Sequence, residues 1–205
     1  MWNDNKRCYE RFAKDILSNF VNEKYESYIL VDKPDIQCKS DSVGIEVVRS
    51  IPTKEGKARN FCNKYFKSFY TDKFICEKKE KMKLPGKFYT RDQYGFRGYT
   101  LGMHDFNSRL KLITDRINGK VIKFKSYEPE FISKRLFVFC DWPIEENNIN
   151  DILIKINDLT YFDEIYFECR IWLYIFNSNE KSLRCITFNA NLYKKLIQKC
   201  FLNIF

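Results

Sequence analysis

The sequence predicts a mixed α/β fold in which helices flank a mixed central sheet, and three observations support this prediction. Apolar residues recur at helical spacing in some segments and in short β-branched runs in others, and the two patterns alternate along the chain. A continuous apolar run at 134–142 is typical of a strand covered on both faces. The chain shows no repeat, low-complexity segment or linker, so we predict one domain over residues 1–205 with an insertion at about 70–104.

The composition is that of a folded protein with a positive surface. Hydrophobic residues make up 44% and aromatic residues 17% of the 205 residues, which supplies a packed core and excludes wholesale disorder. The formal net charge of +9 favours an acidic partner such as nucleic acid. A generally Lys-rich soluble protein would carry the same charge, so this alternative stays open.

The cysteine pattern and the hydropathy indicate a reduced, cytoplasmic protein. None of the eight cysteines has CxxC spacing and there is one histidine, so a zinc site is poorly supported. We expect the cysteines to be reduced and mostly buried. The sequence has no charged-then-apolar leader and no apolar run approaching 18 residues, so we expect no membrane association.

The first part of the chain is predicted to form a helix, three strands and a second helix. The first helix is predicted because apolar residues recur at i, i+3, i+4 and i+7. The strands are predicted from β-branched and aromatic runs between polar turns. The predicted elements are a helix at Lys6–Asn22, strands at Tyr25–Val31, Asp35–Lys39 and Val43–Arg49, and a helix from Thr53.

The later part of the chain is predicted to continue the alternation of helices and strands. One helix is predicted to begin at a cap, Asp105 or Asn107, and to run to Asn118, because Gly119 is a natural stop. The remaining predicted elements are a strand at Lys134–Trp142, a helix at Ile144–Leu159, strands at Phe162–Ile171, Trp172–Phe176 and Leu183–Phe188, and a closing helix at Asn191–Cys200.

Residues 74–101 have no regular pattern and interleave basic with aromatic residues. We expect a loop or hairpin insertion beside the functional site. Because arginines contact phosphates and exposed aromatic rings stack on bases, Lys87, Arg91 and Arg97 are predicted nucleic-acid contacts. A β-hairpin whose aromatic rings pack on the core explains the same pattern equally well.

The stretch KPDIQCKSDSVGIEVVR, residues 33–49, contains the candidate site. Glu46 lies inside a β-branched run, where a carboxylate is expensive to bury unless it is paired or binds a metal. A hairpin around the turn at 39–42 would bring Asp35 and Glu46 side by side. Two carboxylates at one point make a site for Mg²⁺ or Mn²⁺. In the alternative, Glu46 points to solvent and Asp35 caps a turn.

This stretch resembles the PD-(D/E)xK nuclease superfamily, which has the restriction-endonuclease-like fold. Pro34 and Asp35 match the PD pair and Glu46 matches the (D/E) position, whereas Val48 stands where the superfamily has a lysine. The sequence GIEVVRSIPTKEGKA is also similar to small, uncharacterised bacterial and phage proteins that read GIEVTR. The motif match covers roughly residues 10–67.

The resemblance implies a restriction-endonuclease-like core with a basic-aromatic insertion, and a site for Mg²⁺ or Mn²⁺. It implies that Asp35 and Glu46 hold the metal together with an acidic residue of the first helix. Glu10 is the predicted residue on that helix, ahead of Asp15. A solvated position on the helix face is the alternative for Glu10.

Because Val48 replaces the lysine, the resemblance implies that a cation from another position assists the reaction. Lys57 on the second helix is the predicted catalytic cation, with Lys54 and Arg49 as other candidates. Lys54 is also a predicted nucleic-acid contact. A solvated or phosphate-contacting role remains the alternative for each of them.

The resemblance therefore predicts a divergent metal-dependent nuclease that cleaves phosphodiester bonds in DNA. The valine at position 48 keeps open a non-catalytic nuclease-like protein, such as a phage or mobile-element inhibitor of a host defence system that binds a protein partner. A structural partner protein whose basic surface serves only solubility is the third possibility. The sequence predicts neither the choice between DNA and RNA nor the cleavage specificity, and it leaves the oligomeric state open.

Overall fold

The computed structural model describes residues 2–51, 53–65, 70–84, 87–89, 98–100, 105–126 and 131–201. The chain divides into two compact units, and the first combines Met1–Ser50 with Leu110–Phe205. The second unit is Ile51–Arg109, so it contains the predicted insertion at 70–104 and extends beyond it on both sides.

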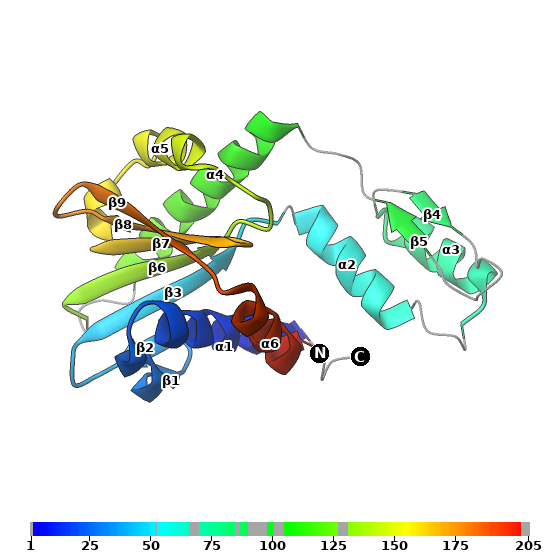
Figure 1. Cartoon of the computed structure of the whole chain (residues 1–205). Helices are drawn as coiled ribbons and strands as arrows, with labels where there is room; N and C mark the ends of the chain where they lie inside the picture. Colours follow the sequence, from blue (N-terminus) through cyan, green and yellow to red (C-terminus); the bar gives the residue numbers. More distant parts are fainter. Residues whose placement is uncertain are drawn as a thin grey trace. The chain divides into compact units, whose positions relative to one another are not determined.

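The first unit contains a mixed seven-stranded sheet in the order β1-β2-β3-β6-β7-β8-β9, drawn as arrows in Figure 1. The neighbours β3, β6 and β7 run parallel, and every other neighbouring pair in this sheet is antiparallel. The strands are β1 (Ile29–Leu30), β2 (Ile36–Cys38), β3 (Val43–Arg49), β6 (Ser133–Phe139), β7 (Glu164–Cys169), β8 (Trp172–Asn177) and β9 (Ser182–Thr187).

Helices cover both faces of this sheet, which confirms the predicted α/β class with a mixed sheet flanked by helices. One face is covered by α1 (Trp2–Phe20) and α6 (Ala190–Phe201), and the other by α4 (Phe106–Lys125) and α5 (Glu146–Ile154), as Figure 1 shows. Successive side chains of a strand point to opposite faces, so β3, β6, β7, β8 and β9 contribute apolar side chains to both layers.

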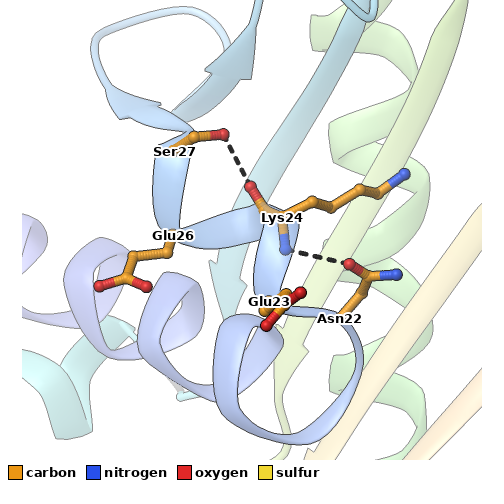
Figure 2. Close-up of a pocket in the computed structure, with 5 residues that line it drawn as sticks. All are labelled: Asn22, Glu23, Lys24, Glu26 and Ser27. Atoms are coloured by element: carbon orange, nitrogen blue, oxygen red, sulfur yellow. Dashed lines mark hydrogen bonds between the residues drawn. The ribbon is translucent and has the colours of Figure 1, made fainter.

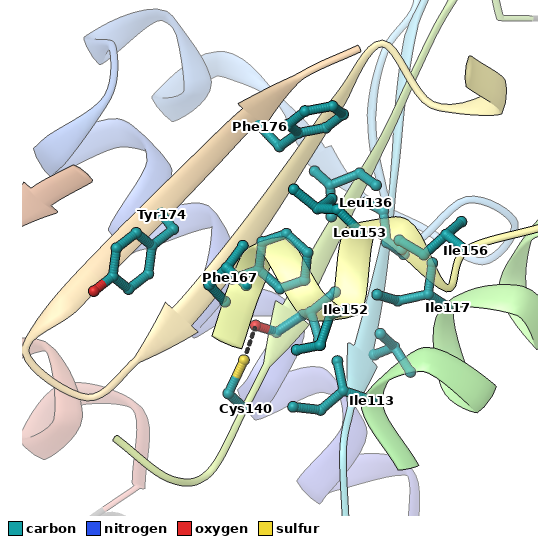
Figure 3. Packing of buried hydrophobic residues seen from close by; sticks show 14 of the residues in the cluster. Ile113, Ile117, Leu136, Cys140, Ile152, Leu153, Ile156, Phe167, Tyr174 and Phe176 are labelled. Atoms are coloured by element: carbon teal, nitrogen blue, oxygen red, sulfur yellow. Dashed lines mark hydrogen bonds between the residues drawn. The ribbon is translucent and has the colours of Figure 1, made fainter. Parts of the chain in front are cut away.

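The two apolar layers fix which side chains of β3 face which helix. Ile45 and Val47 belong to the layer beneath α1, whereas Val48 packs in the layer beneath α4. The period of two therefore directs Glu46, like Val48, toward α4. In Figure 3, Ile113 and Ile117 of α4 lie against the layer that the sheet and α5 complete.

The predicted strand at Tyr25–Val31 is wrong over most of its length. The segment begins with a 3₁₀ turn, Glu23–Ser27, and only the two residues of β1 pair with the sheet. The reason is local, because the Asn22 side chain accepts a hydrogen bond from the Lys24 N–H at 3.0 Å and starts the turn.

The predicted end of the helix at Asn118 is also wrong, because α4 continues through Gly119 to Lys125. A glycine inside a helix costs about 1 kcal/mol relative to alanine. The burial of Val121 and Phe124 in the following turns outweighs that cost, at about 1.5–3 kcal/mol for each apolar side chain. Of the two predicted caps, Asp105 is confirmed, because its carboxylate accepts from the Ser108 N–H at 2.9 Å.

The described residues of the second unit form two helices and a two-stranded antiparallel sheet. The basic run that the sequence left irregular forms α3, whose N-terminus is capped by Thr71 through a 3.2 Å bond from the Phe74 N–H. The elements are α2 (Thr53–Tyr65), α3 (Asp72–Lys81), β4 (Lys87–Tyr89) and β5 (Gly98–Thr100).

Candidate active site

The β2–β3 hairpin brings the two predicted carboxylates together. In the antiparallel pairing, Ile36 lies opposite Ile45, and the same register places Asp35 opposite Glu46. Asp35 is further fixed because its Oδ2 accepts a hydrogen bond from the backbone N–H of Val47 at 2.8 Å. The hairpin predicted from the sequence is therefore confirmed.

Two neighbours hold the chain in place immediately before Asp35. The Gln37 side chain donates from Nε2 to the carbonyl oxygens of Lys33 and Pro34, each at 3.1 Å. A Cβ added to Gly44 would lie 2.6 Å from Pro34 Cγ, so only glycine lets the proline ring lie this close to β3. These contacts set the point at which Asp35 enters the sheet.

Lys120 of α4 supplies a cation to this pair. Its Nζ donates to Glu46 Oε2 and lies 4.0 Å from Asp35 Oδ2. Sequence reasoning missed this residue because the helix was predicted to end at Asn118. The signal was present, since Val121 and Phe124 continue the helical spacing of the buried residues past the glycine and place Lys120 at the border of the buried face.

The two carboxylates are almost completely shielded from solvent. Glu46 is 1% exposed and Asp35 is 2% exposed. Burial raises the pKa of Glu46, the charge of Asp35 raises it further, and Lys120 opposes both effects. Two carboxylates facing one ammonium group leave a site at which a further cation would be stabilised.

The chemistry of these donors fits Mg²⁺ or Mn²⁺. Both ions prefer oxygen ligands, and Mg²⁺ is commonly held by one or two carboxylates, waters and the phosphates of a substrate. Within the described ranges, no group of three or more His, Cys, Asp and Glu side chains is arranged to hold a metal ion. A metal at this point would therefore rely on Asp35 and Glu46, with the substrate supplying further ligands.

Among the described residues, Glu10 does not form a metal-binding group with Asp35 and Glu46. It is buried on α1, which packs on the α1–α6 face of the sheet, whereas Glu46 faces α4. Asp15, the other candidate on α1, pairs with Lys199 of α6 at 2.9 Å. The structure thus brings Asp35 and Glu46 together and does not add Glu10 to them as a third carboxylate, so a metal-binding role for Glu10 stays a prediction.

Of the cations predicted from the sequence to assist the reaction, Arg49 belongs to the first unit and Lys57 to the second. Arg49 stacks its guanidinium over the Tyr9 ring at 3.7 Å and pairs with Asp141 at 3.5 Å. Lys57 is an exposed residue of α2, in the second unit. A catalytic role for Lys57 stays a prediction.

The predicted nucleic-acid contacts lie at least partly outside the described residues. Lys54 belongs to α2 and Lys87 to β4, and their side chains are outside the description. Arg91 and Arg97 lie outside the described ranges altogether.

A second buried carboxylate, Glu168 of β7, has a different environment. Tyr193 of α6 donates its hydroxyl proton to Glu168 Oε1, and the Arg170 N–H donates to the same oxygen at 2.9 Å. Burial raises the pKa of Glu168 to about 7. No lysine or arginine ion pair to Glu168 is present among the described residues, so neutral donors satisfy this carboxyl group.

Figure 2 shows a surface pocket at the 3₁₀ turn, and neither Asp35 nor Glu46 lines it. Its lining side chains are all exposed, so it lacks the enclosing apolar walls of a small-molecule site. The lining residues are Asn22, Glu23, Lys24, Glu26 and Ser27.

No protein-family model matches the chain, and no curated protein or solved structure is significantly similar to it. Among the helices of the described residues, none is both long enough and apolar enough to span a bilayer.

Proposed function

We propose that this protein is a divergent metal-dependent nuclease that cleaves phosphodiester bonds in DNA. The observation that supports this most strongly is the meeting of Asp35, Glu46 and Lys120. Asp35 directly precedes β2, Glu46 lies on β3, and Lys120 belongs to α4, far away in the sequence. Buried carboxylates that face one another are costly, and such pairs are common at functional sites.

The order of elements also supports the resemblance to the restriction-endonuclease-like fold. A helix precedes three strands with antiparallel neighbours, and β6 then joins β3 in parallel after α4 has crossed one face of the sheet. Asp35 directly precedes β2 and Glu46 lies on β3, and this order is compatible with the PD and (D/E) positions that the resemblance assigns to them.

In this proposal Lys120 takes the part that the resemblance assigns to the lysine missing at position 48. Val48 and Glu46 share the face of β3 that α4 covers, so a lysine from α4 reaches the same space as a lysine at position 48. Its ammonium group would orient the attacking water and offset charge on the phosphate.

The two carboxylates would hold Mg²⁺ or Mn²⁺ in this proposal. The ion would lower the pKa of bound water and stabilise the charge that develops on the phosphate. Asp35 would stay in place through its bond from the Val47 N–H, and the burial of both carboxylates would limit competition from bulk water.

A cleavage assay tests the proposal. Purified protein is incubated with supercoiled plasmid and with linear DNA in Mg²⁺, Mn²⁺ or EDTA. We expect cutting in either metal and none in EDTA. Glu46→Gln and Lys120→Met should each lower the rate by at least about 100-fold, the scale of losing one charged group at a reacting centre.

Glu168→Gln is the matched control, because it also neutralises a buried strand carboxylate. Its cutting rate should equal that of the wild-type protein. Cutting that survives Glu46→Gln would identify a contaminant and contradict the proposal.

The second candidate is a non-catalytic nuclease-like protein that binds nucleic acid or a protein partner, such as an inhibitor of a host defence system. The contact between Lys120 and both carboxylates favours it, because an ammonium group offsets part of their charge without any metal. Binding without cutting, unchanged by Asp35→Asn or Glu46→Gln, would support this candidate over the nuclease.

A further inference from the structure

One side of α4 carries three cations in a row, Arg116, Lys120 and Lys123. At 3.6 residues per turn, Arg116 and Lys123 lie about 40° and about 60° around the helix from Lys120, in the same direction. The three side chains therefore project from a single side of α4, with Lys120 in the middle of the row along the helix axis.

This row lies on the side of α4 that borders β3. Ile113, Ile117 and Phe124 of α4 are buried against the sheet, and Lys120 beside them reaches Glu46 of β3. Lys123 is exposed and Arg116 is partly exposed, so the row continues from the carboxylate pair toward the surface.

Side chains on the other border of the buried face of α4 contact residues 157 and 158 of the first unit. Lys125 pairs with Asp158 at 2.9 Å, and the Asn118 side chain accepts from the Asn157 N–H at 3.0 Å. These contacts fix the rotation of α4 about its own axis and hold the cationic row toward β3.

Two cations of the row, Lys120 and Lys123, act electrostatically on Glu46. Burial and the charge of Asp35 raise the pKa of Glu46, whereas Lys120 and then Lys123 lower it. Lys123 therefore acts on Glu46 through its charge, whereas the hydrogen bond to Glu46 among the described residues comes from Lys120.

We propose that this row is the track for one strand of the nucleic-acid substrate, with Lys120 at the phosphate beside Asp35 and Glu46 and with Arg116 and Lys123 on the flanking phosphates. At a rise of 1.5 Å per residue, the row spans about 10 Å along the helix. Three successive phosphates of one strand of duplex DNA span two steps of about 3.4 Å, about 7 Å along the duplex axis, and the long arginine and lysine side chains can bridge the difference. The inference rests on the proposed function, which places the reacting phosphate at the carboxylate pair.

A nucleic-acid strand fits the row better than an acidic protein does. Its charges follow one another along a single direction, and the three cations also follow one another along the helix, at steps of four and three residues. The planar guanidinium of Arg116 also matches the geometry of phosphate oxygens, which it binds in a bidentate manner. Carboxylates on a folded protein surface have no such linear order.

The salt dependence of binding tests this inference without any cutting. The affinity of a fluorescein-labelled single-stranded 20-mer is measured by anisotropy in EDTA over a range of KCl concentrations, for the wild-type protein, Arg116→Gln, Lys123→Gln and the double variant. Each substitution should lower the slope of log affinity against log salt by about 0.7, the value for one phosphate contact on a single strand. At 0.1 M salt this corresponds to about 5-fold weaker binding for each substitution.

Lys111→Gln is the matched control, because Lys111 is an exposed lysine of the same helix on the side opposite Lys120. Its slope should equal that of the wild-type protein. Equal slopes for Lys111→Gln and the double variant would overturn the inference. Poly-L-glutamate and an unlabelled oligonucleotide of equal charge are then compared as competitors of the labelled 20-mer. If both compete equally well, the inference would be overturned in favour of an acidic protein partner.

The same variants separate this inference from the proposed function. If the Arg116→Gln and Lys123→Gln variants have a lower salt slope of binding but the protein shows no metal-dependent cutting, the nuclease proposal would be overturned. The proposed track for the strand would remain. Metal-dependent cutting with unchanged slopes would overturn the track and leave the nuclease.

Discussion

Glu46 and Glu168 are both buried carboxylates on strands of the same sheet, yet they face opposite apolar layers. Glu46 has charged neighbours, whereas Glu168 has neutral hydrogen-bond donors. Glu46 faces a second carboxylate and a lysine from α4. Glu168 accepts hydrogen bonds from a tyrosine hydroxyl and a backbone N–H. Burial raises the pKa of both groups, so burial by itself does not distinguish a functional carboxylate from a structural one.

The difference between them lies in the charge of the surroundings. Neutral donors satisfy Glu168 and are compatible with its protonated form, so this residue can fold into the core near neutral pH. The environment of Glu46 contains a repelling carboxylate and one ammonium group, which favours the binding of additional positive charge. Most of the following predictions alter the surroundings of either Glu46 or Glu168.

Removing the lysine should have the largest effect on stability. Lys120→Met leaves Asp35 and Glu46 facing one another without a cation, which should lower the free energy of unfolding by about 3 kcal/mol at pH 8, the scale of breaking a buried ion pair. The loss should be smaller at pH 5, because Glu46 then takes up a proton more readily. Urea unfolding at both pH values measures it.

The double variant Glu46→Gln, Lys120→Met provides the check. It should recover most of the lost stability, since no carboxylate pair remains to be neutralised. A double variant as unstable as Lys120→Met would show that lost packing, and not charge, causes the effect.

Gly44→Ala should disturb Glu46 and leave Glu168 unchanged. The added Cβ would lie 2.6 Å from Pro34 Cγ and 2.9 Å from Phe131 Cγ, so the hairpin must shift at a cost of about 1–3 kcal/mol. The shift moves Asp35 away from its place opposite Glu46. Thermal unfolding measures the cost, and carboxyl NMR titration should show a changed pKa for Glu46 and an unchanged pKa for Glu168.

Glu168→Gln should change how stability depends on pH. The pKa of Glu168 is about 7 in the folded protein against an ordinary value of 4.5, so the unfolded chain binds fewer protons between these values. The contribution of Glu168 to stability is therefore fully present below about pH 4.5, falls as the pH rises to about 7, and is constant above that. Glutamine keeps an acceptor for the Tyr193 hydroxyl. Because glutamine does not titrate, the variant should lose the decrease in stability that Glu168 causes between pH 4.5 and about pH 7.

Urea unfolding at pH 5 and pH 8 measures the effect of Glu168→Gln. The variant should gain stability relative to the wild-type protein on going from pH 5 to pH 8. A variant whose stability falls as steeply with pH as that of the wild-type protein would place the titrating group elsewhere.

Gly119→Ala should have the smallest effect, and it should be favourable. No heavy atom lies within 4 Å of the added Cβ beyond the neighbours along the helix, so alanine should stabilise α4 by about 0.5–1 kcal/mol. Thermal unfolding measures the gain. A loss of stability would mean that the helix needs the glycine at this position.

Local sequence patterns were enough to predict β3, the hairpin and the pairing of Asp35 with Glu46. A β-branched run, a polar turn and a register of side chains are properties of neighbouring residues, and β3 has the predicted bounds, Val43–Arg49.

Lys120 escaped prediction because its position depends on tertiary packing. Gly119 predicts a helix stop when it is considered locally, and only the burial of Val121 and Phe124 against the sheet carries the helix past it. The 3₁₀ turn before β1 was missed for the opposite reason, since a local cap at Asn22 prevailed over an apolar pattern typical of a strand.

Binding of Mn²⁺ tests the central claim most directly, because it does not depend on the choice of substrate. Electron paramagnetic resonance counts free Mn²⁺ in titrations of the wild-type protein, Asp35→Asn, Glu46→Gln and Glu168→Gln. The account predicts one site, weakened at least about 10-fold by either substitution in the hairpin and unchanged by Glu168→Gln. Equal Mn²⁺ binding by all four proteins, or none by the wild-type protein, would contradict it.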